Sequence, residues 1–432
     1  MKKGHKISLI VLGLLIFLLI FEILRDALTK NGDFIGYVLV GNLVMQGENI
    51  YSDPLINTWP PFFSIVSVPI AIIDNFNIYL VRFIWLVMSV FAMFHIVKYT
   101  TRMSIDRKLT TFPIKLSQKL TNSKINISHW IVLMPILIVF RYLLDNLANI
   151  QINIFILLLS IVSIYSFIKG KDILAALFLA FGISLKIYPI FLFLFFIVKR
   201  EYKVVLFTTL FCIVFSCVPF LVFGYEQTME YYAFWYNKNV VPFSSVGHKN
   251  QSFFSMMRSL LLHESPGLNQ PLNKEIYLNI LNLTIEQVKI VSYTLIVALG
   301  SGVVYLFRKK YLDRSSLKAF LEFTFILTII PILSPLAWKA FFIFLFPGYF
   351  ISYLFIFHFN NSLNKITNKY LRISFFVSLI LTVFSSELFL GKYYSDVFEA
   401  YSCITLGTIL VALNILIFYV GFDKYDRLLK YE

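Results

Sequence analysis

The chain has 432 residues, of which 59% are hydrophobic, 18% aromatic and only 14% charged, with a mean hydropathy of +0.78. A soluble domain carries about a quarter charged residues, so this composition excludes a soluble globular protein and predicts an integral membrane protein. The net charge of +15 is explained first by membrane topology and not by nucleic-acid binding, because lysine and arginine are retained on the cytoplasmic side.

The N-terminal half begins with a helix over residues 7–24, which follows a basic N-terminus and is too long for a cleaved signal peptide. Residues 25–77 then form an outer loop rich in Asp, Asn, Gly and Tyr. Within it, the run 61–73 is shorter than the roughly 20 residues of a crossing, and we expect it to lie on the outer surface. A helix over 78–97 returns the chain inside.

The loop 98–128 supports this topology. It holds seven basic residues and one acid, so it belongs in the cytoplasm, and it would fall outside if the run 61–73 crossed the membrane. Further helices are expected at 129–140, 151–168, 173–185, 187–198, 204–222, 287–307, 319–333, 340–358, 373–388 and 399–421.

These segments predict an all-α polytopic membrane protein with about twelve transmembrane helices, forming one domain over residues 1–432 with both termini in the cytoplasm. Most of the 38 lysine and arginine residues then lie inside, in a multi-pass protein of a bacterial plasma membrane. The outer loops 25–77 and 223–286 are too long for simple connections. Long loops on a rigid scaffold tend to carry function, so the active face is expected to be extracytoplasmic.

The segment 172–198 is too short for two full crossings and predicts a helical hairpin that turns at Lys186–Pro189. The turn places the Lys186 ammonium at membrane depth, where a charge usually faces a polar cavity or an anionic partner. The alternative is that Lys186 extends to the outer interface and binds nothing.

Ionisable residues gather at the outer helix ends, and two halves with matching broken helices, expected of a secondary transporter, are not apparent. A carboxylate among several cations suits displacement of a phosphate leaving group, since a base deprotonates the acceptor hydroxyl and cations hold the phosphate. The residues are Asp33, Arg82, Arg141, Asp145, Lys186, Arg258 and Lys339.

Several short motifs, taken in order, resemble glycosyltransferase family 87, the polyprenyl-phosphate-mannose-dependent mannosyltransferases of the GT-C superfamily. Each motif alone is weak, but together they cover about residues 30–345. They are Gly32–Tyr37, Gly47–Tyr51, Trp59–Phe62, Asn149–Asn153, Leu185–Pro189, Asn250–Ser252 followed by Arg258, and Leu333–Trp338.

The resemblance implies a GT-C type fold with juxtamembrane helices in the first outer loop, and it singles out Asp33 as the catalytic base. Glu48 and Asp53 are the rival carboxylates. The residues expected to bind the donor phosphate are Lys186, Arg82 and Arg258. Those expected to bind substrate are Tyr37, Gln151, Asn153, Asn250, Gln251, Trp338 and Lys339.

The chain departs from the family pattern after the Ser-Pro-x-x-Trp block, where many members have histidines and this sequence has Lys339. This departure leaves mannose specificity and the acceptor class open. His248 and His263 could substitute, although solvated loop residues are the simpler interpretation. No Asp-x-Asp pair occurs, so a nucleotide-sugar donor held by a divalent ion is unsupported, and neither a metal nor a cofactor is expected.

The leading hypothesis is a membrane hexosyltransferase, for mannose, that uses a polyprenyl-phosphate sugar donor and a glycan or glycolipid acceptor, by an inverting single displacement. A lipid-linked glycan flippase or transporter is the alternative, and a structural partner of another transferase is a third. The aromatic run 231–236 is either a sugar-stacking platform or an ordinary interfacial belt. Nucleic acid is not an expected partner.

Overall fold

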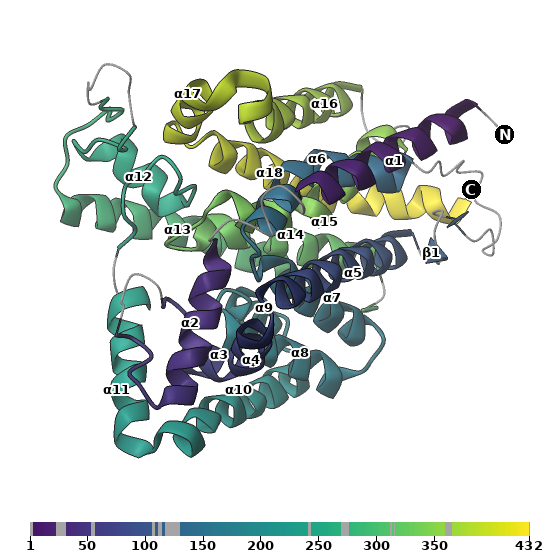
Figure 1. Cartoon of the computed structure of the whole chain (residues 1–432). Coiled ribbons are helices and arrows are strands. Elements are labelled where there is room, and N and C mark those ends of the chain that lie inside the picture. The colour runs from purple at the N-terminus through teal and green to yellow at the C-terminus, as the bar shows by residue number, and fades with distance from the viewer. Residues whose placement is uncertain are drawn as a thin grey trace. The chain divides into compact units, whose positions relative to one another are not determined.

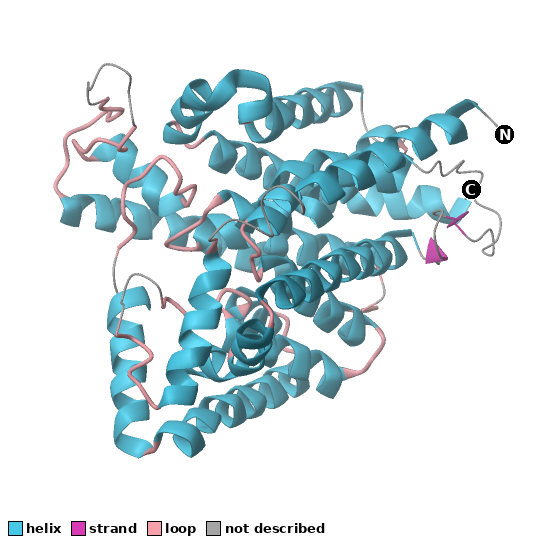
Figure 2. Ribbon diagram, in the orientation of Figure 1, coloured by secondary structure: helices cyan, strands magenta, loops and turns pink. Residues whose placement is uncertain are grey.

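The computed structural model describes residues 3–22, 32–52, 57–105, 109–110, 115–116, 130–240, 243–268, 276–311, 313–314, 316–358 and 365–431. Within these ranges the architecture is helical, as Figure 2 shows, apart from one pair of two-residue antiparallel strands. The strands are β1 (Leu109–Thr110) and β2 (Lys115–Leu116). The all-α class predicted from the sequence is therefore confirmed.

Helices cover both halves of the chain (Figure 1). In the first half they are α1 (Lys3–Glu22), α2 (Asp33–Gln46), α3 (Pro61–Val66), α4 (Val68–Phe76), α5 (Ile78–Ile105), α6 (Trp130–Ala148), α7 (Asn153–Ile168), α8 (Asp172–Leu185), α9 (Ile190–Val198) and α10 (Tyr202–Phe223). In the second half they are α11 (Tyr225–Trp235), the π-helix η2 (Tyr236–Val240), α12 (Phe253–Leu261), α13 (Ile285–Phe307), α14 (Leu317–Leu333), the 3₁₀-helix η3 (Lys339–Leu345), α15 (Phe346–Phe357), α16 (Lys365–Leu379), the π-helix η5 (Ile380–Phe384), α17 (Glu387–Ala400) and α18 (Cys403–Tyr431).

Six described helices are long and apolar enough to cross a membrane. These are Ile78–Ile105, Trp130–Ala148, Tyr202–Phe223, Ile285–Phe307, Lys339–Phe357 and Cys403–Gly421. A seventh is reached if Thr367–Phe384 and Glu387–Ala400, bent by 87°, count as one span. Shorter apolar helices lie at Asp33–Gln46, Pro61–Phe76, Asn153–Ile168 and Asp172–Leu185. The chain is thus a membrane protein, while the twelve crossings stay a prediction.

The chain folds as two compact units. The first unit comprises Met1–Thr100 and Leu143–Pro242, and the second comprises Thr101–Tyr142 and Phe243–Glu432. In the first unit α8 packs against α7 and α10, and α2 packs against α3 and α4. In the second unit α18 packs against α14 and α16. The single domain and the loop boundaries expected from the sequence stay predictions.

The hairpin expected in segment 172–198 is present. Helix α8 ends at Leu185 and α9 begins at Ile190, with Pro189 at its N-cap. At about 1.5 Å per residue both helices are shorter than the roughly 30 Å hydrocarbon layer. The turn that carries Lys186 therefore has a defined place in the fold, between two half-length helices.

Several helix boundaries differ from the sequence-based expectation; α16, for example, begins at Lys365 and not at residue 373. Helix α5 continues past residue 97 to Ile105, because Lys98 and Arg102 are good helix formers although polar. Helix α6 continues past residue 140 to Ala148, so Arg141 and Asp145 lie inside it instead of following it. A helix, α17, spans the whole segment between residues 388 and 399 that was expected to be a connection.

Part of the first outer loop is also helical. Residues Asp33–Gln46 form α2, whose buried positions face α3 and α4. Helices α3 and α4 occupy the short segment that was expected to be helical but not to cross the membrane. Gly41 permits this packing, because a Cβ there would lie 2.5 Å from the Ser67 carbonyl oxygen. Propensity alone did not indicate α2, since Asp, Asn and Gly interrupt its apolar pattern.

Helix α11 forms the first part of the second expected outer loop, 223–286. It follows α10 at Gly224, whose φ of +78° permits the corner that Figure 1 shows between the two helices. Tyr231 on α11 accepts a 3.4 Å hydrogen bond from the backbone N–H of Ile50, and Trp235 Nε1 donates to the Thr58 carbonyl at 3.2 Å. Two members of the aromatic run 231–236 thus hold the residues that follow α2.

Candidate functional site

The first cluster of polar residues surrounds Asp33, the first residue of α2. The preceding residue, Gly32, lies against the turn between α6 and α7, and a Cβ there would lie 2.7 Å from the Asn149 carbonyl oxygen. In the same turn Ile150 has a φ of +47°. Only glycine fits at position 32, so this close contact determines where α2 begins and where the Asp33 carboxylate lies.

Lys186 belongs to the same cluster. Its ammonium donates a 2.8 Å hydrogen bond to Asn153 Oδ1, and Asn153 Nδ2 donates a 2.6 Å hydrogen bond to Gln151 Oε1. Asn153 and Gln151 are buried, whereas Lys186 and Asp33 are partly exposed. Lys186 also interacts electrostatically with Asp33. Three sequence motifs that lie far apart in the chain therefore meet here.

Both charged groups of this cluster lie outside the six helices long enough to cross a membrane. Burial raises the pKa of Asp33 above its usual value, and the nearby Lys186 charge only partly opposes this. Burial lowers the pKa of Lys186 to about 8, and the Asp33 charge again opposes part of the change. Burial thus makes Asp33 a stronger base than a solvated carboxylate, and the Lys186 ammonium stays charged below about pH 8 and can bind an anion there.

Tyr37, one turn after Asp33, supports the cluster. Its side chain is buried and its hydroxyl accepts a 3.3 Å hydrogen bond from the Ile152 backbone N–H. The ring packs edge-on against Trp59, with centroids 4.8 Å apart, and against Phe63 at 5.2 Å. Tyr37 therefore joins α2 to the start of α7, which holds the Lys186 partner Asn153.

Arg82, expected to bind the donor phosphate, lies in α5 with a 2% exposed side chain. Its guanidinium carbon lies 5.9 Å from the Phe34 ring centroid, and it interacts electrostatically with Asp74. These contacts place Arg82 close to Phe34 in the first turn of α2. Its role in binding the donor phosphate stays a prediction.

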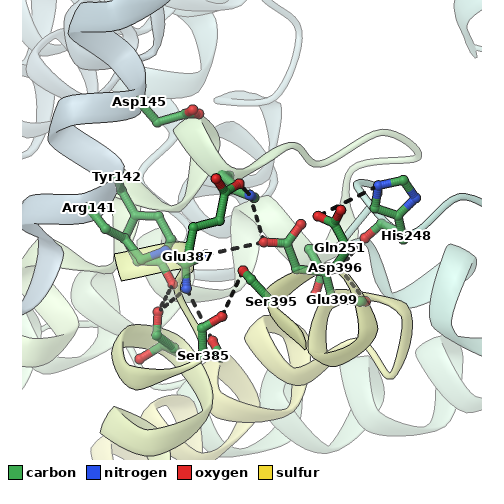
Figure 3. Close-up of polar contacts among 12 residues, drawn as sticks. Arg141, Tyr142, Asp145, His248, Gln251, Ser385, Glu387, Ser395, Asp396 and Glu399 are labelled. Atoms are coloured by element: carbon green, nitrogen blue, oxygen red, sulfur yellow. Dashed lines mark hydrogen bonds and ion pairs between the residues drawn. The ribbon is translucent and has the colours of Figure 1, made fainter. Parts of the chain in front are cut away.

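A second polar cluster lies in the second unit, around Glu399 of α17 (Figure 3). The Glu399 carboxylate is 1% exposed, and its Oε1 contacts Lys339 Nζ at 2.7 Å and Arg141 Nη2 at 3.2 Å. Arg141 Nη1 also donates to the Thr382 carbonyl at 2.9 Å and to Ser385 Oγ at 3.1 Å. One buried carboxylate thus binds two cations that the sequence had placed at separate helix ends.

Asn250 and Gln251 join the second cluster to the Leu333–Trp338 block. Asn250 Oδ1 accepts from the Ala337 N–H at 3.0 Å, and Asn250 Nδ2 donates to the Pro335 carbonyl at 3.2 Å. The Gln251 N–H donates to the Ala337 carbonyl at 2.8 Å, and its side chain donates to the Glu399 carbonyl at 2.6 Å. These two amides therefore position mainly the backbone around them, although Asn250 Nδ2 also donates to Ser244 Oγ at 2.8 Å.

The remaining predicted residues of the second unit are more exposed. Trp338 is 47% exposed. Arg258, expected to bind phosphate, donates from Nε to Glu264 Oε2 at 2.7 Å and from Nη1 to the Ser244 carbonyl at 2.9 Å. His248 Nε2 lies 3.9 Å from Asp396 Oδ1, and the two side chains face one another in Figure 3.

His263 stacks on Tyr277 with ring centroids 4.2 Å apart, at an exposed position. Among the rival carboxylates, Glu48 is exposed just after α2, and Asp53 lies outside the described residues. Sequence reasoning missed Glu399 and its neighbour Glu387. The available signal was an acid at the start of the expected helix 399–421, where a buried charge requires a partner.

Sequence profiles of protein families match residues 57–335 to glycosyltransferase family 87. The matched range covers well over half of the 432 residues. The chain belongs to glycosyltransferase family 87. Together with its apolar helices, this membership makes it a membrane glycosyltransferase, which acts on a sugar donor and an acceptor substrate. No curated protein sequence matches the chain.

The matched range of this family 87 glycosyltransferase includes Asn153, Lys186 and the Asn250–Ser252 motif, whereas Asp33 precedes it and Glu399 follows it. The contacts described above connect both outlying residues to matched ones, Asp33 to Lys186 and Glu399 to Gln251. The fold thus brings unmatched residues of each unit against the family motifs of the same unit.

Proposed function

We propose that this family 87 enzyme transfers a hexose, mannose, from a polyprenyl-phosphate donor to a glycan or glycolipid acceptor at the extracytoplasmic face of the plasma membrane. The observation that carries the proposal is the Asp33–Lys186 cluster: a carboxylate with a raised pKa beside an ammonium that a neutral amide holds in place. These groups are what a displacement with a phosphate leaving group requires.

The reaction is a single displacement. The acceptor hydroxyl oxygen attacks the anomeric carbon as the bond from that carbon to the phosphate oxygen breaks, and polyprenyl phosphate leaves with the electron pair. Asp33 receives the acceptor proton, and Lys186 stabilises the charge that develops on the phosphate. Attack from the face opposite the leaving group inverts the anomeric centre, and one carboxylate is sufficient. A retaining route through a covalent intermediate would need a second carboxylate at about 5 Å.

A lipid-linked donor suits the surroundings of this cluster. Asp33 begins the short apolar helix α2, and Lys186 directly follows the short apolar helix α8. Helix α10 of the same unit exposes apolar side chains along its length. In a bilayer those exposed faces contact lipid. A donor with a polyprenyl chain can therefore keep its chain in the bilayer while its phosphate reaches Lys186.

The test uses the purified protein in liposomes with polyprenyl-phosphate mannose that carries a labelled sugar, and a lipid extract as acceptor. We expect acceptor-dependent release of polyprenyl phosphate and label in a new glycolipid. A matched donor with glucose tests the sugar. Movement of intact donor across the bilayer without release would instead identify a flippase and contradict the proposal.

A further inference from the structure

We propose that Glu399 is a positioning residue that holds Lys339 in the conformation in which it binds substrate. The inference rests on the proposed function and on the sequence-based expectation that Lys339 binds substrate. Glu399 lies outside the range that matches the family, and its role comes from its contacts in the second unit.

The side chain of Glu399 provides the first argument. It is 1% exposed, and one oxygen, Oε1, receives both the Lys339 ammonium at 2.7 Å and the Arg141 guanidinium at 3.2 Å. Arg141 is itself held by the Thr382 carbonyl and the Ser385 hydroxyl. The carboxylate therefore has little freedom to move, and charge-assisted bonds of this length are strong and directional.

The backbone of Glu399 provides the second argument. Its carbonyl accepts the Gln251 side-chain amide at 2.6 Å, and the Gln251 N–H bonds the Ala337 carbonyl at 2.8 Å. Thr405 Oγ1 donates to the Gln251 carbonyl at 2.7 Å. The residues just before Lys339 are thus connected to α17 and α18 through Gln251. Glu399 therefore contacts the Lys339 ammonium directly and is linked to the backbone next to Lys339 through Gln251.

A second carboxylate near Lys339 provides a comparison. Glu387 Oε1 lies 3.5 Å from Lys339 Nζ, and its side chain is 54% exposed. Ion pairs between solvent-exposed side chains contribute little, because water screens the charges and the side chains are mobile. Glu399, not Glu387, therefore determines where the Lys339 ammonium lies.

Lys339 starts η3 directly after the exposed Trp338, and its own side chain keeps 21% of its surface exposed. A free lysine side chain loses conformational entropy when it binds a ligand. A lysine already held by Glu399 has lost that entropy during folding. Removing Glu399 should therefore raise the KM of the substrate that Lys339 contacts, with a smaller effect on kcat.

The experiment compares Glu399→Gln, Lys339→Met and the double variant in the full-length enzyme, with KM measured for donor and acceptor. We expect both single variants to raise the KM of the same substrate about tenfold and to change kcat less than threefold. The double variant should have the same KM as Lys339→Met alone, because the carboxylate acts through the lysine. The matched control Glu387→Gln should stay within twofold of the wild type.

The inference would be overturned if the KM increases of the single variants multiply in the double variant. It would also be overturned if the two single variants raise the KM of different substrates, or if Glu387→Gln has an effect equal to that of Glu399→Gln. If Glu399→Gln does not fold because two buried cations lose their counter-charge, Glu399→Asp keeps the charge. It should raise the KM severalfold in the wild type and leave it unchanged in the Lys339→Met background. Wild-type protein that releases no polyprenyl phosphate contradicts the proposed function, whereas an active wild type with independent effects contradicts this inference alone.

Discussion

Lys186 donates its 2.8 Å hydrogen bond to Asn153, a residue 33 positions earlier in the chain. The acceptor is an amide oxygen, which orients the ammonium without neutralising it. The nearby carboxylate, Asp33, interacts with Lys186 electrostatically. An ammonium held in this way can bind a phosphate and still stay close to the base that receives the acceptor proton.

Replacing Lys186 should impair use of the donor more than folding. The loss of a charge-assisted contact to phosphate costs on the order of 1.5 to 3 kcal/mol, so the donor KM of Lys186→Met should rise roughly ten- to hundredfold. Kinetics of purified protein at varied donor concentration measure this. The control Lys171→Met, exposed at the start of α8, should retain the wild-type KM. An unchanged KM and kcat in Lys186→Met would remove Lys186 from the site.

The pH dependence of kcat/KM for the donor should have an alkaline limb set by Lys186. The free enzyme loses the ammonium charge as pH rises through about 8, the value to which burial lowers the Lys186 pKa. Above that pH, kcat/KM should fall about tenfold per unit. Lys186→Arg keeps its charge to above pH 12 and should abolish this limb. A profile that falls in the same way for both proteins would assign the limb to another group.

Replacing Asp33 should slow the chemical step. Asp33→Asn keeps size and hydrogen-bonding capacity but removes basicity, so kcat should fall by ~10² to 10⁴. The exposed Glu48 provides the matched control Glu48→Gln, and Asp53→Asn should likewise retain most activity. Proton NMR of the product gives its anomeric configuration, which should be opposite to that of the donor. Near-normal turnover in a folded Asp33→Asn protein, or retention of configuration, contradicts the mechanism.

Gly32 should tolerate no side chain. In Gly32→Ala the new Cβ would lie 2.7 Å from the Asn149 carbonyl oxygen, and relief of that overlap moves Asp33. We expect a loss of about 1 to 3 kcal/mol in stability, seen as a lower Tm in detergent, with a reduced kcat. Gly300→Ala, within α13 and with no neighbour close to its Cβ, should be stabilising by roughly 0.5 to 1 kcal/mol. Equal Tm values for Gly32→Ala and the wild type would show that the contact is absent.

The orientation in the membrane can be tested by cysteine labelling. Charge asymmetry places the loop 98–128 in the cytoplasm and Asp33 and Asn250 outside. Ser244 near Asn250 is buried, whereas Ser245 is exposed, so Ser245→Cys is the outer site and Ser117→Cys the inner one. In a cysteine-free variant in intact cells, an impermeant reagent should label position 245 and not position 117. The reverse pattern would invert the topology.

Local sequence patterns were sufficient to predict the class of the protein and the places of most of its helices. Hydropathy and charge are local properties, so runs such as 204–222 and 287–307 appear within two residues of α10 and α13. The short hairpin at Lys186 was predictable for the same reason, because its length is set by the basic residues on either side. The motifs that resemble family 87 indicated the enzyme class.

Which residues contact one another became apparent only from the fold. Asp33 begins α2 and Lys186 follows α8, and the contact of Gly32 with Asn149 determines where α2 begins. Glu399 was the first residue of the expected helix 399–421, and nothing in that segment indicated Lys339 or Arg141 as its partners. Such pairings depend on how side chains from distant segments fill shared space and satisfy one another's charges. Neither the periodicity nor the composition of a single segment records that information.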